Sequence, residues 1–133
     1  MAASSHAKRL GTFGEQKAVE YLQKQGFTIL ARNFRAGHGE IDIIAREGEY
    51  LCFVEVKTCR AASFGEPEAW VTPRKQKRMI SAARRYRALH DLNDMDCRYD
   101  VIALRLQRGA LSIHHIRDAF WLNEENDDER DDW

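Results

Sequence analysis

The segment YLCFVEVKT, residues 50–58, is the feature that most constrains the fold. It is rich in β-branched and aromatic residues, which favour a strand. Alternation places Cys52, Val54 and Val56 on one face and Leu51 and Phe53 on the other. Both faces are therefore largely apolar, which is typical of a strand covered on both sides. Glu55 and Lys57 enter this core-like environment, so they are the first candidates for chemistry.

The rest of the chain predicts an α/β fold around this strand. Gly26 is a typical cap for a first helix, and Thr72-Pro73 is a typical start for a second. The predicted order is helix 9–25, strands 27–35, 39–45 and 50–58, helix 73–90, and strands 98–106 and 111–116. In the second strand, Ile41, Ile43 and Ala45 are expected on one face and Glu40, Asp42 and Ile44 on the other. A helix between the third and fourth strands implies a crossover that makes them parallel. We therefore expect a mixed sheet flanked by helices.

The length of 133 residues fits one compact domain. We expect an N-terminal arm over residues 1–8, the domain over 9–122, and an acidic, disordered tail over 123–133. The sequence shows neither a run of about 20 apolar residues for a membrane span nor a signal peptide. The three cysteines form no CxxC pair, which favours reduced thiols in a cytoplasmic protein.

The charge is zero overall but unevenly distributed. Residues 123–133 carry seven acids and one arginine, whereas residues 72–87 carry seven basic residues and no acid. Such a basic helix predicts either phosphate contacts with a nucleic acid or a face that is charged for solubility. The candidate nucleic-acid contacts are Arg74, Lys75, Lys77, Arg78, Arg84 and Arg85.

Asp42 and Glu55 are expected to converge because their strands are joined by the short turn Glu47-Gly48. Counting outward from that turn places Asp42 opposite residues 53 to 55. Paired carboxylates suit Mg²⁺ or Mn²⁺, and Lys57 beside them can activate water or balance charge on a phosphate. A structural ion pair of Lys57 with Glu55 or Asp42 explains the same residues equally well.

Two further polar residues occupy inward positions on the predicted helices. Glu15 projects onto the apolar face of the first helix, between Gly11 and Ala18. Gln76 projects onto the apolar side of the second helix, away from most of its basic residues.

Several stretches carry a resemblance to a known family: GTFGEQKAVEYLQKQGF, RNFRAGHGEIDIIA, LCFVEVKTCR, TPRKQKR and RYDVIAL. Over residues 9–120 the chain resembles the YraN-like family of uncharacterised bacterial proteins. That family is similar to the PD-(D/E)xK nucleases and to archaeal Holliday junction resolvases. The resemblance implies a restriction-endonuclease-like α-β-β-β-α-β core. It also implies that Glu15, Asp42, Glu55 and Lys57 match the nuclease signature, that Gln76 is an active-site residue, and that the Val56 carbonyl is a metal ligand.

These observations lead us to expect a Mg²⁺- or Mn²⁺-dependent endonuclease-like protein acting on DNA, with branched or structured DNA among the candidate substrates. In this interpretation Asp42 and Glu55 hold the metal, Glu15 assists through its water shell, and Lys57 activates water. Gln76 positions that water or a phosphate. The alternative is a non-catalytic nucleic-acid-binding or adaptor module that retains the fold. A homodimer, and a contact of the acidic tail with the basic helix or with a basic partner, stay open.

Overall fold

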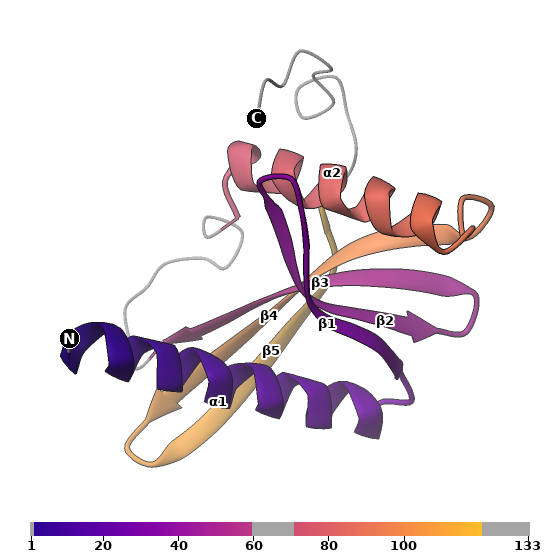
Figure 1. The fold of residues 1–133 in the computed structure, drawn as a ribbon. Coiled ribbons are helices and arrows are strands. Elements are labelled where there is room, and N and C mark those ends of the chain that lie inside the picture. The colour runs from indigo at the N-terminus through magenta and orange to yellow at the C-terminus, as the bar shows by residue number, and fades with distance from the viewer. Residues whose placement is uncertain (1, 60–70, 121–133) are drawn as a thin grey trace.

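The computed structural model describes residues 2–59 and 71–120, and the side chains of the first helix from Gly11 onward. Its elements are α1 (Ala2–Lys24), β1 (Thr28–Ala36), β2 (Gly39–Glu47), β3 (Tyr50–Cys59), α2 (Pro73–Leu89), β4 (Asp96–Gln107) and β5 (Ala110–Phe120). Figure 1 shows the sheet between the two helices, with α1 along one face and α2 along the other. The predicted α/β class and element order are confirmed. The expected tail over 123–133 lies outside the described residues.

The five strands form one mixed sheet in the order β1-β2-β3-β4-β5. β3 and β4 are parallel, whereas β1 with β2, β2 with β3, and β4 with β5 are antiparallel. The helix that connects the parallel pair is α2, as the crossover argument predicts. β3 is the middle strand, which explains why both of its faces are apolar.

A separate apolar core lies on each face of the sheet. On the α2 side, Leu51 and Phe53 pack with Ile80 and Tyr86. On the α1 side, Cys52 and Val54 pack with Leu22. The predicted faces of β3 are therefore correct, and Glu55 follows Phe53 on the α2 side.

The face predicted for Ile41 is wrong. We expected Ile41 to point the same way as Ile43, but it is fully buried in the α2-side core, whereas Ile43 belongs to the α1-side core. The paired register of β2 with β3 ends at Ile43 and Val54. Beyond this point β2 leaves its neighbour and turns toward α2, so simple alternation no longer applies.

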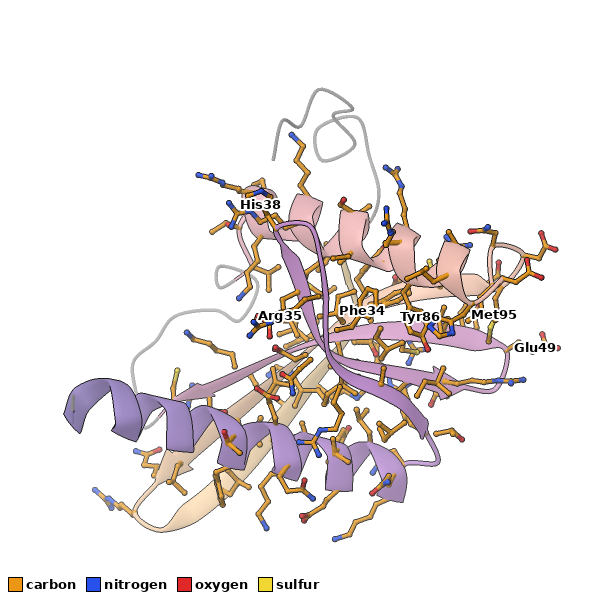
Figure 2. The ribbon with its side chains drawn as sticks, in the orientation of Figure 1. Phe34, Arg35, His38, Glu49, Tyr86 and Met95 are labelled. Carbon is orange, nitrogen blue, oxygen red and sulfur yellow. The ribbon has the colours of Figure 1, made fainter. Side chains whose placement is uncertain are left out.

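The β1–β2 hairpin lies directly against α2. Gly39 is buried, and a Cβ atom at this position would overlap the carbonyl oxygen of Arg78. A glycine is therefore required for this approach. Figure 2 shows His38 at the end of the hairpin beside the first turns of α2, and Phe34 nearer to Tyr86. The hairpin and the helix together form the walls of the candidate site.

The first helix is longer than expected. It begins at Ala2, whereas the sequence pattern predicts a start near Arg9. Among the described residues, neither helix has an apolar stretch long enough to cross a membrane.

Candidate functional site

The site is built around two carboxyl groups on neighbouring strands. Ile43 on β2 pairs with Val54 on β3, so Asp42 and Glu55 are the next two residues in the same register. The backbone N–H of Val56 donates a hydrogen bond of 2.8 Å to Oδ2 of Asp42. The Asp42 side chain therefore accepts a hydrogen bond from the β3 backbone at the point where the regular pairing of β2 with β3 stops. The predicted convergence of the two acids is found in the structure.

The two carboxyl groups lie where negative charge is unfavourable. Burial, reinforced by the negative charge of Glu55, raises the pKa of Asp42 to about 8, against the hydrogen bond from Val56. Burial also raises the pKa of Glu55, whose residue is only 7% exposed. The two carboxyl groups are neighbours, and a proton on one of them lets it donate a hydrogen bond to the other. With no metal ion bound, this arrangement favours a proton on the pair near neutral pH.

A cavity of about 310 Å³ opens in front of these groups, and we call it the acidic cavity. It lies between the start of β2 and the first turns of α2, and its lining residues are His38, Glu40, Asp42, Glu55, Thr72, Arg74, Lys75, Arg78 and Met79. Thr72 caps α2, because its hydroxyl accepts a 3.2 Å hydrogen bond from the backbone N–H of Lys75. The positive end of the helix and three basic side chains thus face the carboxyl groups of Glu40, Asp42 and Glu55 across one cavity.

Lys75 provides the cation that contacts Glu55. Its Nζ lies 2.5 Å from Oε1 of Glu55. The Lys75 side chain is 44% exposed, so one end of this ion pair is accessible from solvent. From the sequence we expected Lys75 to contact a phosphate. Its position three residues after the helix cap does not indicate that it would pair with Glu55.

Lys57 lies near the end of β3. It follows Glu55 by two residues on β3, but its side chain is exposed. Lys57 is not one of the residues that line the acidic cavity, and among the described residues it forms no ion pair with Asp42 or Glu55. The ion-pair alternative considered for Lys57 is thus realised by Lys75 instead.

Glu15 approaches the site from α1. Gly14 is buried against β3, where an added Cβ would overlap the hydroxyl of Thr58. This close contact brings Glu15 near enough for its charge to contribute to the raised pKa of Asp42. Glu15 is half-buried, in agreement with the inward position predicted from the helical pattern.

Gln76 and the basic residues of α2 are distributed along the helix. The Gln76 side-chain amide donates a 2.8 Å hydrogen bond to the carbonyl of Val71, which fixes the chain entering α2. Arg74, Lys75 and Arg78 line the acidic cavity, whereas Arg84 and Arg85 lie toward the other end of the helix. Lys77 is half-buried and lines neither hollow.

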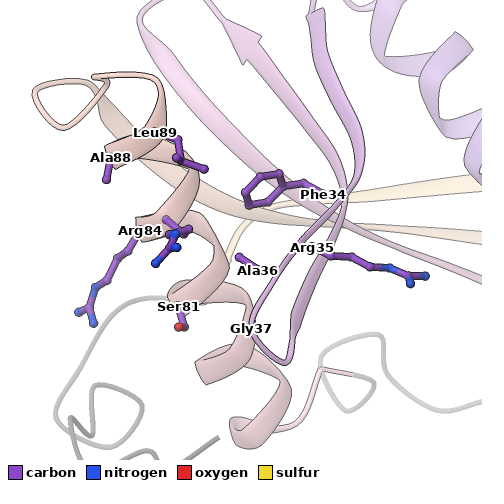
Figure 3. A pocket seen from close by; sticks show the side chains of 9 residues that line it. Phe34, Arg35, Ala36, Gly37, Ser81, Arg84, Ala88 and Leu89 are labelled. Carbon is purple, nitrogen blue, oxygen red and sulfur yellow. The ribbon is translucent and has the colours of Figure 1, made fainter.

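A second hollow of about 720 Å³, the distal groove, lies between β1 and the C-terminal half of α2. Its lining residues are Phe34, Arg35, Ala36, Gly37, Ser81, Arg84, Arg85, Ala88 and Leu89. Figure 3 shows Phe34 directed toward the helix and Arg35 directed away from it. Arg35 lies 3.5 Å from Glu40, so its charge is shared with an acid outside the groove.

Asp100 anchors a buried network on the α1 side of the molecule. It is fully buried and contacts Arg98 at 3.0 Å, Nε2 of His115 at 2.8 Å and the backbone N–H of Asp118 at 3.0 Å. Burial opposes its charge, but these donors outweigh burial and lower the pKa of Asp100. Asp100 therefore has a structural role, because it binds Arg98 and His115 together inside the fold. His115 was not foreseen, because its partner lies on a different strand.

Comparison with known proteins identifies the family. The model of the uncharacterised protein family UPF0102 matches residues 14–104. The chain belongs to the UPF0102 family. A UPF0102 protein of Geobacter sulfurreducens is 45% identical over 120 residues, covering 90% of this chain and 94% of the relative. Another, of Geotalea daltonii, is 48% identical over 116 residues, covering 86% of this chain and 91% of the relative.

The UPF0102 match covers the region that builds the site. Residues 14–104 include both carboxyl groups, Glu15, Lys57 and all of α2. The expected YraN-like family is therefore confirmed. The description of the family names no activity.

Proposed function

We propose that this protein is a metal-dependent nuclease that hydrolyses phosphodiester bonds in DNA, with the acidic cavity as its active site. The observation that carries the proposal is the meeting of Asp42 and Glu55 in a cavity whose opposite wall is the basic start of α2. Carboxylates recruit a hard divalent cation, and a helix N-terminus with basic side chains receives a phosphate. Phosphodiester hydrolysis is assisted by a metal that activates water and by positive charge that stabilises the phosphate.

The donor set fits Mg²⁺ or Mn²⁺. Such ions take one or two carboxylates and complete their coordination with water and substrate oxygens. Among the described residues no group of three or more acids, histidines or cysteines could hold a metal, so Asp42 and Glu55 would be its only side-chain ligands. The Val56 carbonyl lies on the β2 side of its strand, because N–H and C=O of one strand residue point the same way. It is thus available as the third ligand that the resemblance implies.

The ion pair between Lys75 and Glu55 balances the charge of Glu55 inside the acidic cavity. While Glu55 contacts Lys75, its charge is balanced without a metal. If Glu55 held a metal ion, the Lys75 ammonium would lose this partner and could bind a phosphate oxygen at the start of α2. We therefore infer that metal and nucleic acid bind cooperatively here, each displacing part of the same ion pair.

The remaining residues complete the proposed mechanism. Lys57, exposed beside the acids on β3, activates the attacking water, and Glu15 assists through the water shell of the metal. The hydrogen bond from Gln76 to Val71 favours a positioning role for Gln76, which holds the start of α2 beside the cavity. Arg74, Arg78 and the more distal arginines contact backbone phosphates, which give affinity with little sequence preference.

Free thiols support a cytoplasmic location. Cys52 is buried, and burial raises the pKa of its thiol to about 12, so it stays protonated. Cys59 and Cys97 are half-buried free thiols. Three reduced cysteines in one small domain fit a reducing compartment.

A cleavage screen tests the proposed activity. Purified protein is incubated with linear, flapped and four-way DNA in Mg²⁺ or Mn²⁺, alongside Asp42→Asn and Lys57→Ala. We expect cleavage of at least one substrate, with loss of about 10²- to 10⁴-fold in Lys57→Ala, because a group that activates water contributes this much. Cleavage that survives in both variants at the wild-type rate would assign the activity to a contaminant.

A non-catalytic binding module is the second candidate, and the Lys75–Glu55 contact favours it. That ion pair neutralises the more deeply buried acid without a metal. In this case DNA binds in metal-free buffer with an affinity that Mg²⁺ does not increase, and none of the three substrates is cut.

A further inference from the structure

The distal groove combines features that the acidic cavity lacks. Phe34 is half-buried in its wall, and Leu89 on the helix is 63% exposed. Two exposed arginines, Arg84 and Arg85, line the same groove. A ligand that matches this surface carries an apolar face and a negative charge.

The orientation of Phe34 is fixed by its neighbours. Its ring meets that of Tyr86 edge-to-face, with the ring centroids 5.2 Å apart, and Tyr86 is buried in the α2-side core. Such aromatic pairs stabilise one ring orientation. Phe34 therefore reaches the groove from a rigid base, as a stacking platform requires.

The distal groove lies beside the acidic cavity along one helix. The contact of Gly39 with Arg78 and Ala82 fixes the hairpin against the middle of α2. The cavity uses residues of α2 up to Met79, and the groove uses residues from Ser81 onward. Lys75 and Arg84 are about 13 Å apart along the helix axis at a rise of 1.5 Å per residue. A single strand covers this distance in a few nucleotides.

We propose that the distal groove binds an unstacked base of single-stranded nucleic acid, with the base on Phe34 and its phosphates on Arg84 and Arg85. Duplex DNA presents phosphates outward and keeps its bases stacked, so it can use the arginines but not the apolar wall. A nucleotide of a single strand offers both a planar base and an anionic backbone. This inference rests on the proposed function for its biological context, and it specifies a single-stranded segment near the bond to be cut.

Binding measured without divalent metal tests the groove apart from cleavage. The probes are a fluorescein-labelled oligothymidylate of twelve nucleotides and a duplex of the same length, titrated in EDTA. Phe34→Leu keeps an apolar side chain but removes the aromatic face. Ala88→Leu adds bulk at an exposed position in the groove. The matched control is Ala110→Leu, at the exposed first residue of β5, and thermal melting confirms that each variant is folded.

We expect both groove variants to bind the single strand about tenfold more weakly, since stacking of one base contributes on that order. Their duplex affinity stays within twofold, and Ala110→Leu changes neither affinity. Because Ala88 is exposed, its variant remains informative even where Phe34→Leu unfolds. Equal single-strand affinities for wild type and Ala88→Leu would overturn the proposal, as would an equal loss for duplex and single strand.

The two proposals fail in different ways. Selective loss of single-strand binding in the groove variants, together with no cleavage of any substrate, would retain the base site and reject the nuclease. Metal-dependent cleavage together with unchanged binding in the groove variants would retain the nuclease and reject the base site.

Discussion

At the scale of single residues, Asp42 lies in an environment that disfavours the ionised form of its carboxyl group. Its pKa is raised to about 8, chiefly by burial and then by Glu55. In the folded protein Asp42 therefore keeps a proton that the unfolded chain releases near pH 4. Between these two pH values the folded state binds more protons, so the free energy of unfolding falls as the pH rises toward 8.

Asp42→Asn should remove this dependence. Asparagine retains an oxygen that can accept the hydrogen bond from Val56 and never ionises. In metal-free buffer we expect the variant to match wild type near pH 4 and to exceed its free energy of unfolding by several kcal/mol at pH 8, since each unit of pKa difference contributes about 1.4 kcal/mol. Urea unfolding at the two pH values measures the difference. A constant offset between the two proteins would show that Asp42 titrates normally.

We predict different effects on stability when Lys75 and Lys57 are each replaced by alanine. Lys75→Ala leaves the buried Glu55 without its partner, so we expect a loss of about 1–3 kcal/mol, reduced from a fully buried pair because Lys75 is partly exposed. Millimolar Mg²⁺ should restore more of this stability than it adds to wild type. The exposed Lys57 should change unfolding by less than about 0.5 kcal/mol when replaced by alanine.

Thermal melting with and without Mg²⁺ measures these effects, with Lys57→Ala as the control. An equal gain from Mg²⁺ in wild type and Lys75→Ala would show that the ion pair and the metal do not compete for Glu55.

The sequence predicts the acids of the site better than its cations. Asp42 and Glu55 could be identified because a charged residue in a two-sided apolar strand is anomalous, and a short turn fixes their register. Lys75 could not be assigned, because its contact with Glu55 depends on how α2 crosses the sheet. Local sequence contains the register of a hairpin but not the crossing of a distant helix.

At the scale of elements, α1 is held against β3 by a position without a side chain. A Cβ on Gly14 would overlap the Thr58 hydroxyl, whereas Gly11, three residues earlier on the same helix, has nothing near the corresponding position. Gly14→Ala should therefore destabilise the protein by about 1–3 kcal/mol, because β3 or α1 must move. Gly11→Ala should stabilise it by about 0.5–1 kcal/mol through helix propensity alone.

Denaturant unfolding of the two variants compares these positions directly. Since Glu15 follows Gly14, we also expect Gly14→Ala to weaken cleavage. Equal stabilisation by both alanines would show that α1 does not approach β3 this closely.

The elements themselves are well predicted because their patterns are local. The two-sided apolar pattern identifies β3, and the Thr72-Pro73 pair identifies the start of α2. The errors arise where tertiary contacts override the pattern. Ile41 turns to the α2 side because β2 leaves β3 after Ile43. The early start of α1 at Ala2 adds polar and small residues, in which the apolar periodicity carries little information.

At the scale of the whole molecule, the basic charge of α2 extends from the acidic cavity to the distal groove. Arg74 lines the cavity and Arg85 lines the groove, and both are exposed. If each binds a phosphate, the double variant Arg74→Gln/Arg85→Gln should lower the slope of log affinity against log salt by about 1.8 on duplex DNA, since each lost contact contributes about 0.9.

The matched control is Arg46→Gln/Arg108→Gln, which removes the same charge from exposed positions off the helix. Fluorescence anisotropy at several salt concentrations gives the slopes. Equal slopes for the two double variants would mean that net charge alone, and not the face of α2, determines DNA affinity.

The central claim is that Asp42 and Glu55 together form a metal site, and calorimetric titration with Mn²⁺ tests it most directly. We predict one Mn²⁺ ion per chain for the wild type, weaker binding in both Asp42→Asn and Glu55→Gln, and binding that is retained or strengthened in Lys75→Ala. An absence of binding by the wild type at millimolar Mn²⁺, or unchanged binding in both acid variants, would contradict the account.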